Sequence, residues 1–192
     1  MTKILITGGA GYIGSKLTYS LLQEGHEITV IDNLMYGGES LLGCSVFENF
    51  NFIYGDITNK TLLRDYVTSN DIIIPLAAIV GAPACDRIPI QSHDINFKSM
   101  KFLIDSVSHS QILIYPTTNS GYGIGQEGIF CDEKTPLNPI SQYGKDKSDV
   151  ERIILDKNIG CSFRLATVFG SSNRMRLDLL VNNFTYLAYS IG

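Results

Sequence analysis

The sequence predicts an α/β domain built on a doubly wound parallel sheet of about six strands. Short apolar runs of about five residues recur along the chain, as buried parallel strands do. Longer segments with helical spacing separate these runs, which favours helical crossovers between parallel strands. The apolar runs are residues 3–7, 27–31, 51–54, 71–76, 111–115 and 161–166. The helical segments are residues 12–23, 60–68, 90–108 and 141–157.

Size and composition favour a single soluble domain. The chain has 192 residues, enough to bury a real core, and 44% of them are hydrophobic. The net charge of −4 and the lack of a Lys/Arg cluster argue against nucleic acid or a membrane as a partner. Four cysteines without CxxC spacing and three isolated histidines predict reduced thiols, a cytoplasmic location and no metal site.

The first apolar run leads directly into the sequence TGGAGYIG at residues 7–14. Glycines in this pattern allow a tight turn, close approach of the backbone to a pyrophosphate, and close packing of helix on strand. The helix that follows would direct free N–H groups and its positive dipole end at the phosphates. A glycine pattern alone is weak, but its place between a strand and an apolar helix is typical of a Rossmann dinucleotide site. The predicted cofactor contacts here are Gly8, Gly11, Tyr12, Ile13 and Gly14.

The second run is followed by Asp32 and Asn33. A carboxylate at this point can accept hydrogen bonds from the adenosine ribose and would repel a 2′-phosphate. No arginine directly follows to attract one, so NAD is predicted rather than NADP. The alternative is that Asp32 only caps a turn.

Two further cofactor contacts are predicted after the third and fourth runs. Asp56, followed by Ile57, could accept a hydrogen bond from the adenine amino group, or could instead cap the helix that starts near Lys60. The small residues of Leu76, Ala77 and Ala78 would let the backbone lie against the cofactor, or could be plain core.

The chemistry is expected after the fifth run, where the stretch YPTTNSGYG places several hydroxyl groups at residues 115–123. A surface loop is the simple interpretation. Further along, Tyr143 and Lys147 are spaced i, i+4, so on a helix they share one face. A nearby ammonium lowers the pKa of a phenol, and such a tyrosine could take a proton from a sugar hydroxyl during hydride transfer.

These segments together resemble the extended short-chain dehydrogenase/reductase family. The resemblance covers nearly the whole chain and implies an NAD-dependent enzyme that acts on a nucleotide-activated sugar. It implies Thr118 as the catalytic hydroxyl, Tyr143 as the acid/base, and Lys147 as its partner, which also binds the nicotinamide ribose. It also implies cofactor contacts at Asn96, Thr117 and Val168. The matching segments are TGGAGYIG (7–14), VIDN (30–33), GDIT (55–58), LAA (76–78), Asn96, TTNSGYG (117–123), YGKDK (143–147) and RLATVFG (164–170).

Asn119 and Ser120, which follow Thr118, narrow the reaction that the resemblance implies. The family's 4,6-dehydratases carry an Asp-Glu pair here, and its GDP-4-keto-sugar epimerase/reductases use a cysteine where Ser120 stands. Neither residue of this chain titrates usefully. Oxidation at C4 of the sugar is therefore expected, either with release of the keto sugar or as the first half of 4-epimerisation. Asn119 and Ser120 are predicted to bind the substrate.

Three runs resemble one branch of the family, the GDP-manno-heptose 4-dehydrogenases, which serve in the synthesis of surface polysaccharide. They are residues 72–83, 115–125 and 164–186. This resemblance implies a GDP-heptose as substrate. Thr167 departs from the family pattern, because many members carry Asn there.

Residues 171–192 are expected to begin the substrate-binding portion, after an NAD-binding domain over residues 1–170 that also carries the catalytic residues. A helix is predicted over residues 176–190, and family members usually continue beyond it. Asn182 matches a family asparagine that contacts the nucleotide diphosphate, or could be a helix surface residue. Arg174 and Arg176 could also meet phosphate or be ordinary surface arginines, and Arg87 could reach the substrate only from a folded-over loop.

The resemblance also implies a homodimer through the helices after the fourth and fifth strands. Packing on the protein's own sheet is the alternative for these side chains. A non-catalytic NAD-binding module without a substrate domain is the alternative to an enzyme. The candidate dimer contacts are Ile95, Met100, Leu103, Ile104, Val150, Ile153 and Ile154.

Overall fold

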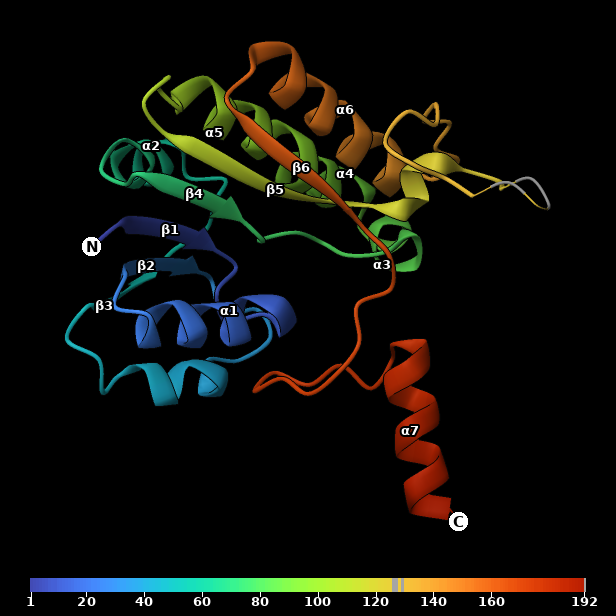
Figure 1. Ribbon diagram of the computed structural model, residues 1–192, viewed down its shortest axis with the longest axis horizontal. Helices are drawn as coiled ribbons and strands as arrows, with labels where there is room; N and C mark the ends of the chain where they lie inside the picture. The colour runs from blue at the N-terminus through green and yellow to red at the C-terminus, as the bar shows by residue number, and fades with distance from the viewer. Residues whose placement is uncertain (126–127, 129, 192) are drawn as a thin grey trace.

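A computed structural model describes residues 1–125, 128 and 130–191, and it confirms the predicted α/β fold. Six strands form one sheet in the order β3-β2-β1-β4-β5-β6, and every neighbouring pair is parallel (Figure 1). The chain therefore builds outward from β1 in one direction and then from β4 in the other, which defines a doubly wound sheet. The strands are β1 Lys3–Thr7, β2 Glu27–Asp32, β3 Phe50–Tyr54, β4 Ile72–Pro75, β5 Ile112–Thr118 and β6 Gly160–Leu165.

Helices cover both faces of this sheet (Figure 1). Helix α1 (Tyr12–Gln23) and the 3₁₀-helix η1 (Glu39–Cys44) lie on one face. Helices α2 (Lys60–Thr68), α5 (Met100–Ser106) and α6 (Gln142–Lys157) lie on the other. The remaining helices are α3 Ala82–Arg87, α4 Pro89–His93, the π-helix η2 Asp94–Ser99, the 3₁₀-helix η3 Asn119–Tyr122 and α7 Leu180–Ile191.

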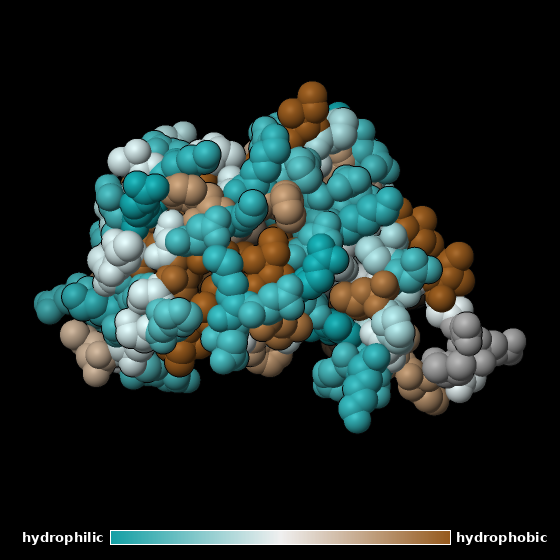
Figure 2. Space-filling model, turned by 90° about the horizontal axis from the view of Figure 1, so that it is seen from above, coloured by the Kyte–Doolittle hydropathy of each residue, from teal (hydrophilic) through white to brown (hydrophobic). Residues whose placement is uncertain are grey.

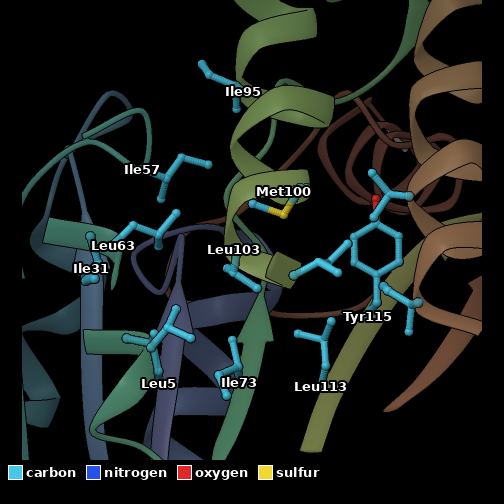
Figure 3. Close-up of a cluster of buried hydrophobic side chains, with 14 of the residues drawn as sticks. Leu5, Ile31, Ile57, Leu63, Ile73, Ile95, Met100, Leu103, Leu113 and Tyr115 are labelled. Atoms are coloured by element: carbon cyan, nitrogen blue, oxygen red, sulfur yellow. The ribbon is translucent and has the colours of Figure 1, made fainter. Parts of the chain in front are cut away.

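Alternating side chains of the central strands feed two separate hydrophobic clusters. Along β1, Ile4 and Ile6 pack in the cluster beneath α1, while Leu5 packs in the cluster beneath α5 and α6. Figure 3 shows the second cluster, in which Leu5, Ile73 and Leu113 meet Leu103 and Met100 of the covering helix. Burial on both faces explains why these strands are apolar without interruption.

The crossover between β4 and β5 differs from its prediction. The single helix expected over residues 90–108 consists of α4, η2 and α5, and a further short helix, α3, precedes them. η2 is a π-helix, whose backbone hydrogen bonds span five residues, and in it the Ser99 hydroxyl also donates to the Asp94 carbonyl at 2.9 Å. Periodicity alone cannot detect this single wide turn.

The stretch that follows β5 is not a simple surface loop. Strand β5 continues to Thr118, three residues beyond its predicted end at Tyr115. It pairs with β6 over this extension, where Thr118 lies opposite Leu165. The short helix η3 starts directly afterwards, and the Thr118 hydroxyl caps it by accepting from the Ser120 amide at 3.2 Å. The extension by β6 pairing carries the polar end of the strand toward the site described below.

Helix α7 begins at Leu180, four residues after the predicted start at residue 176. The Arg176 and Asp178 side chains pair with each other in the preceding segment, which is not helical. Figure 1 shows α7 extending away from the sheet. Its predicted apolar face is consequently open to solvent in this chain, with Phe184 62% exposed. None of the helices that the structure describes is long and apolar enough to cross a membrane.

The predicted dimer contacts are mostly occupied within the chain. Met100, Leu103 and Ile104 of α5 are buried in the core cluster, as are Ile95, Val150 and Ile154, and Ile153 packs partly against it. Figure 2 views the side that carries α5 and α6, and this side is mostly hydrophilic with separate apolar patches. The packing alternative therefore holds for these side chains, and the homodimer stays a prediction.

Candidate functional site

A cavity of about 600 Å³ lies at the carboxyl ends of the strands. Its lining includes residues that follow β1, β2, β3, β4 and β5, and it spans the point between β1 and β4 where the strand order reverses. Ligands of open α/β sheets bind at this switch point, and the volume falls within the ~300–1,000 Å³ range of small-molecule sites. The lining comprises the predicted residues Gly8, Gly11, Tyr12, Ile13, Gly14, Asp32, Asn33, Asp56, Ile57, Leu76, Ala77, Ala78, Thr117, Thr118, Asn119, Ser120, Tyr143, Lys147 and Val168.

The glycine-rich turn is shaped so that the backbone itself forms one wall of the cavity. Gly8 has a φ of +74°, and a Cβ on it would lie 2.5 Å from the Ala77 amide nitrogen. A Cβ on Gly14 would collide with the Gly8 carbonyl oxygen. Helix α1 starts at Tyr12 without a side-chain cap or an acidic residue in its first turn. Its leading N–H groups and dipole are thus available to a phosphate, as a dinucleotide requires.

Asp32 is held in place by the main chain at the end of β2. Its Oδ2 accepts from the Ala10 amide at 2.9 Å and its Oδ1 accepts from the Leu34 amide at 2.8 Å. Each oxygen keeps a free lone pair for a further donor, which suits ribose hydroxyl groups. The carboxylate is both a turn-stabilising group and a wall of the cavity, so the two interpretations of Asp32 are compatible.

Asp56 does not cap the following helix, because Asn59 is the N-cap of α2 and accepts from the Leu62 amide at 3.2 Å. Asp56 instead accepts from the Thr58 amide and hydroxyl, and from Asn33 Nδ2 at 2.9 Å. Burial raises the pKa of this carboxyl, but these hydrogen bonds outweigh it and lower the pKa overall. The site therefore holds a fixed anion beside Asn33.

The three predicted catalytic side chains meet at the opposite end of the cavity. Ser141 caps α6 by accepting from the Gly144 amide at 3.1 Å, and the first turns of this helix then present Tyr143 and Lys147 to the cavity. Thr118 reaches the same space from the end of β5, where its hydroxyl donates to the Ser120 hydroxyl at 3.2 Å. Strand and helix thus bring together residues that lie 25 or more positions apart, as the resemblance implied.

Burial, rather than the charge of Lys147, dominates the pKa of Tyr143. Burial raises the pKa of Tyr143 to about 12, helped by Cys85, while Arg176 and the Thr118 hydroxyl lower it. Burial also lowers the pKa of Lys147 to about 7. The ammonium lies 4.3 Å from the centre of the Tyr115 ring. Desolvation dominates the pKa of both side chains, and their i, i+4 spacing gives no information about burial.

Asn96 does not line the cavity. It is buried, its Oδ1 accepts from the Ile79 amide at 2.9 Å, and its Nδ2 donates to the Ile79 carbonyl at 2.9 Å. Ile79 itself is a lining residue, so Asn96 fixes the backbone of the wall. Direct contact between Asn96 and the cofactor stays a prediction.

Asn182 also lies outside the cavity lining. Its Oδ1 accepts from the Gly170 amide at 2.9 Å, and its Nδ2 donates to the Tyr12 hydroxyl and the Arg176 carbonyl, both at 3.0 Å. It is buried rather than a helix surface residue. Contact between Asn182 and a diphosphate remains a prediction.

The segment between β6 and α7, residues 166–179, crosses back to the glycine-rich turn, and we call it the clasp. The Tyr12 hydroxyl donates to the Gly170 carbonyl at 2.7 Å, and the Ser172 hydroxyl donates to the Tyr12 carbonyl at 2.6 Å. Farther along, the Arg174 guanidinium lies 4.4 Å from the centre of the Tyr36 ring. These contacts close the cavity over the start of α1.

Several lining residues were not predicted as contacts. Met35, Tyr36 and Gly37 extend the wall beyond Asn33, and Val80 and its neighbours extend it beyond Ala78. The sequence signal that could have found them was their position, since each group directly extends a segment of predicted contacts. Arg174, Arg176 and Thr167 also line the cavity, whereas Arg87 does not. Within the described ranges, no group of three His, Cys, Asp or Glu side chains could hold a metal ion.

Proteins similar to this chain include 4-epimerases of nucleotide sugars. UDP-arabinose 4-epimerase 1 of Arabidopsis thaliana is 32% identical over 92% of this chain and 45% of its own length. UDP-glucose 4-epimerase of Lactobacillus helveticus is 31% identical over 89% of this chain and 53% of its own length. The chain thus spans about half the length of these curated relatives.

Solved structures agree with the fold. The UDP-Glc/GlcNAc 4-epimerase of Campylobacter jejuni superposes with a TM-score of 0.78 at 28% identity, covering 85% of this chain and 53% of that one. The dTDP-glucose 4,6-dehydratase of Bacillus anthracis, solved with NAD, shares the fold with a TM-score of 0.82 at 24% identity, covering 98% and 62%. Residues 4–186 match the NAD dependent epimerase/dehydratase family, so the chain belongs to that family, whose cofactor is the NAD that its sequence predicts.

Proposed function

We propose that this chain is the cofactor-binding and catalytic part of an enzyme that oxidises C4 of a nucleotide sugar and returns the hydride to give the 4-epimer. The meeting of Thr118, Tyr143 and Lys147 in one cavity carries the proposal. The 4-epimerases among the relatives support the position on the sugar. Asn119 and Ser120, which line the same cavity without a titratable group, argue against a dehydratase.

The residues divide the work of proton transfer. Bound NAD would supply the hydride acceptor and an added positive charge beside the phenol. Tyr143, as phenolate, would take the proton from the sugar hydroxyl, and Thr118 would hold the same oxygen through its hydroxyl. Lys147 would bind the nicotinamide ribose, which positions the ring for hydride transfer.

The sugar nucleotide is a finer proposal. The resemblance to the GDP-manno-heptose 4-dehydrogenases supports a GDP-heptose and release of the keto product, whereas the relatives support UDP-sugars and epimerisation. Asp32 and the clasp concern the binding of the dinucleotide, so they do not distinguish a GDP-heptose from a UDP-sugar. A panel of substrates decides between them.

The test incubates the protein and NAD with GDP-manno-heptose, GDP-mannose, UDP-glucose, UDP-galactose and UDP-arabinose, followed by mass spectrometry and chromatography. A new isomer of unchanged mass is the expected result. Loss of two hydrogens would instead indicate a released 4-keto sugar, and loss of water would contradict the interpretation of Asn119 and Ser120. Tyr143→Phe serves as the inactive control.

An NAD-binding module without catalysis is the second candidate. The exposed apolar side chains of α7, which no other described element covers, favour it. It predicts that NAD binds with normal affinity while every sugar in the panel stays unchanged.

A further inference from the structure

Lys147 is a buried amine whose positive charge has no acidic partner among the described residues. Its side chain lies on α6 and is only 6% exposed. Burial alone lowers its pKa to about 7, and no carboxylate or hydrogen-bond acceptor of the described chain opposes that effect. Buried ammonium groups in proteins are ordinarily paired. The group that holds this ammonium is therefore to be sought among the uncharged side chains around it.

The aromatic ring of Tyr115 lies directly against this ammonium. The Lys147 Nζ is 4.3 Å from the centre of the ring, well within the ~6 Å over which a ring face attracts a cation. Tyr115 is 1% exposed and belongs to the hydrophobic cluster beside α6, as Figure 3 shows. Burial raises the pKa of its phenol well above the ordinary value, so the ring is a neutral partner. The attraction is stronger for a desolvated pair than for an exposed one.

We infer that Tyr115 is a positioning residue, whose ring face holds Lys147 in its charged form at the wall of the cavity. The inference deepens the proposed function and rests on the role of Lys147 given there. A charged ammonium has three donors for the ribose hydroxyls and favours the phenolate of Tyr143, whereas a neutral amine has fewer donors and no charge. A carboxylate partner would occupy these donors. A ring face attracts the charge and leaves N–H groups free for the cavity, which Lys147 lines and Tyr115 does not.

The buried carboxylates near Lys147 on α6 already have other partners. Glu151 lies one helical turn after Lys147, but its Oε1 is 2.8 Å from the Nε of Arg164 on β6. Asp146 accepts from Gln142 of the same helix, and its Oδ1 lies 2.9 Å from the Nδ1 of His93 on α4. Groups on the other elements around α6 are neutral or paired elsewhere: the buried thiol of Cys85 on α3, Tyr122 of η3 beside Arg164, Asp94 with Lys98 on η2, and Asp105 of α5 with Lys157.

Strand β5 connects this support to the catalytic hydroxyl. Tyr115 and Thr117 are both buried and, at i and i+2 on the strand, share one face. The strand is paired with β6 from Leu113 to Thr118, so its backbone is fixed over the whole stretch. The strand that ends in Thr118 thus also sets where the Lys147 ammonium lies. The ring and the hydroxyl are three residues apart on one rigid element.

The experiment follows the titration of Lys147 by NMR of its ¹³C-labelled side chain, in the full chain without any sugar and with the same NAD content in every sample. The signal is assigned by its loss in Lys147→Met. Tyr115→Leu should lower the midpoint by about 0.5 to 1 pH unit, a roughly three- to tenfold weaker hold on the proton. Tyr115→Phe keeps the ring face and should titrate like the native protein. Phe102→Leu is the matched control, because Phe102 packs against the same cluster but lies by Lys60 and Arg64 instead.

An unchanged or raised midpoint in Tyr115→Leu would overturn the inference, and so would an equal fall in Phe102→Leu, which would mean a general loosening of the core. A fall of the same size in Tyr115→Phe would overturn it too, because the hydroxyl and not the ring would then be responsible. Tyr115→Met gives a second variant without a ring if the leucine protein does not fold. Because no sugar is present, failure here is distinct from failure of the proposed epimerase activity, which the substrate panel measures.

Discussion

At the scale of single residues, the pKa values of the site's acid/base groups are set by burial more than by the neighbouring residues in the sequence. Tyr143 and Lys147 lie on one helix face as their spacing predicts. Burial nevertheless raises the pKa of Tyr143 and lowers that of Lys147, so that the neutral form of each side chain is favoured. At Gly8 and Gly14, by contrast, the close packing that the local sequence predicts is present, because a Cβ at either position would clash with the backbone. Two predictions belong to this scale.

Lys147 should make the protein more stable as the pH rises. Its folded pKa is about 7 against an ordinary value of 10.5, so between these values the unfolded chain binds a proton that the folded protein does not. Stability is then lowest below pH 7 and recovers as the pH rises toward 10. Lys147→Met removes this dependence. Urea unfolding at pH 6 and pH 9 should show the methionine variant gaining, relative to the native protein, on the order of 1 to 3 kcal/mol more at pH 6 than at pH 9. An equal gain at both pH values would contradict the lowered pKa.

Gly14→Ala should weaken NAD binding. The added Cβ collides with the backbone of Gly8 and Gly9, which forces α1 away from the turn that faces the phosphates. A loss of tenfold or more in NAD affinity is expected by calorimetry. Gly43→Ala, at a helical glycine whose nearest contact would be 3.9 Å away, is the control and should bind normally.

Elements lie where the sequence predicts them when the signal is local. Strand β1 and helix α1 have the predicted bounds because the glycine-rich turn punctuates them. Strand β5 runs past its predicted end because β6 pairs with it, and the π-turn of η2 interrupts the single helix that the periodicity predicts. Most of the residues predicted as contacts line the cavity, but the packing of Asn182 could not be predicted, because it depends on a contact with Tyr12, 170 residues away. Tertiary contacts of this kind leave no periodic trace in a sequence.

The clasp should slow the exchange of cofactor. Tyr12→Phe removes the donor to the Gly170 carbonyl and the acceptor for Asn182 while keeping the ring. NADH should dissociate about two- to tenfold faster, measured by stopped-flow displacement with excess NAD. Tyr19→Phe, on the same helix and outside the cavity lining, is the control. An unchanged dissociation rate would show that the clasp does not gate the cofactor.

The whole molecule is a sheet covered by helices on both faces, and its ligand site contains residues from nearly every part of the chain. The lining begins at Gly8 and continues to Leu179, so binding there ties the ends of the domain together. A ligand that binds only the folded protein raises its stability in proportion to the logarithm of its concentration.

NAD should therefore stabilise the entire domain, and NADP should not. At about 100 times its dissociation constant, NAD adds about 2.7 kcal/mol to the free energy of unfolding, or about 5–10 °C in melting temperature. NADP should give little shift, because the fixed carboxylate of Asp32 repels a 2′-phosphate. Differential scanning fluorimetry with both dinucleotides is the measurement, and equal shifts would contradict the assignment to NAD.

The clasp has a consequence for the order of events as the protein is made. The N-terminal part of a chain leaves the ribosome first during synthesis. Strand β1, the glycine-rich turn and α1 are made first, yet Tyr12 finds its partners only in Gly170, Ser172 and Asn182. A nascent chain can build its sheet and meet the dinucleotide early, but it can retain that dinucleotide firmly only after the residues up to Asn182 have left the ribosome.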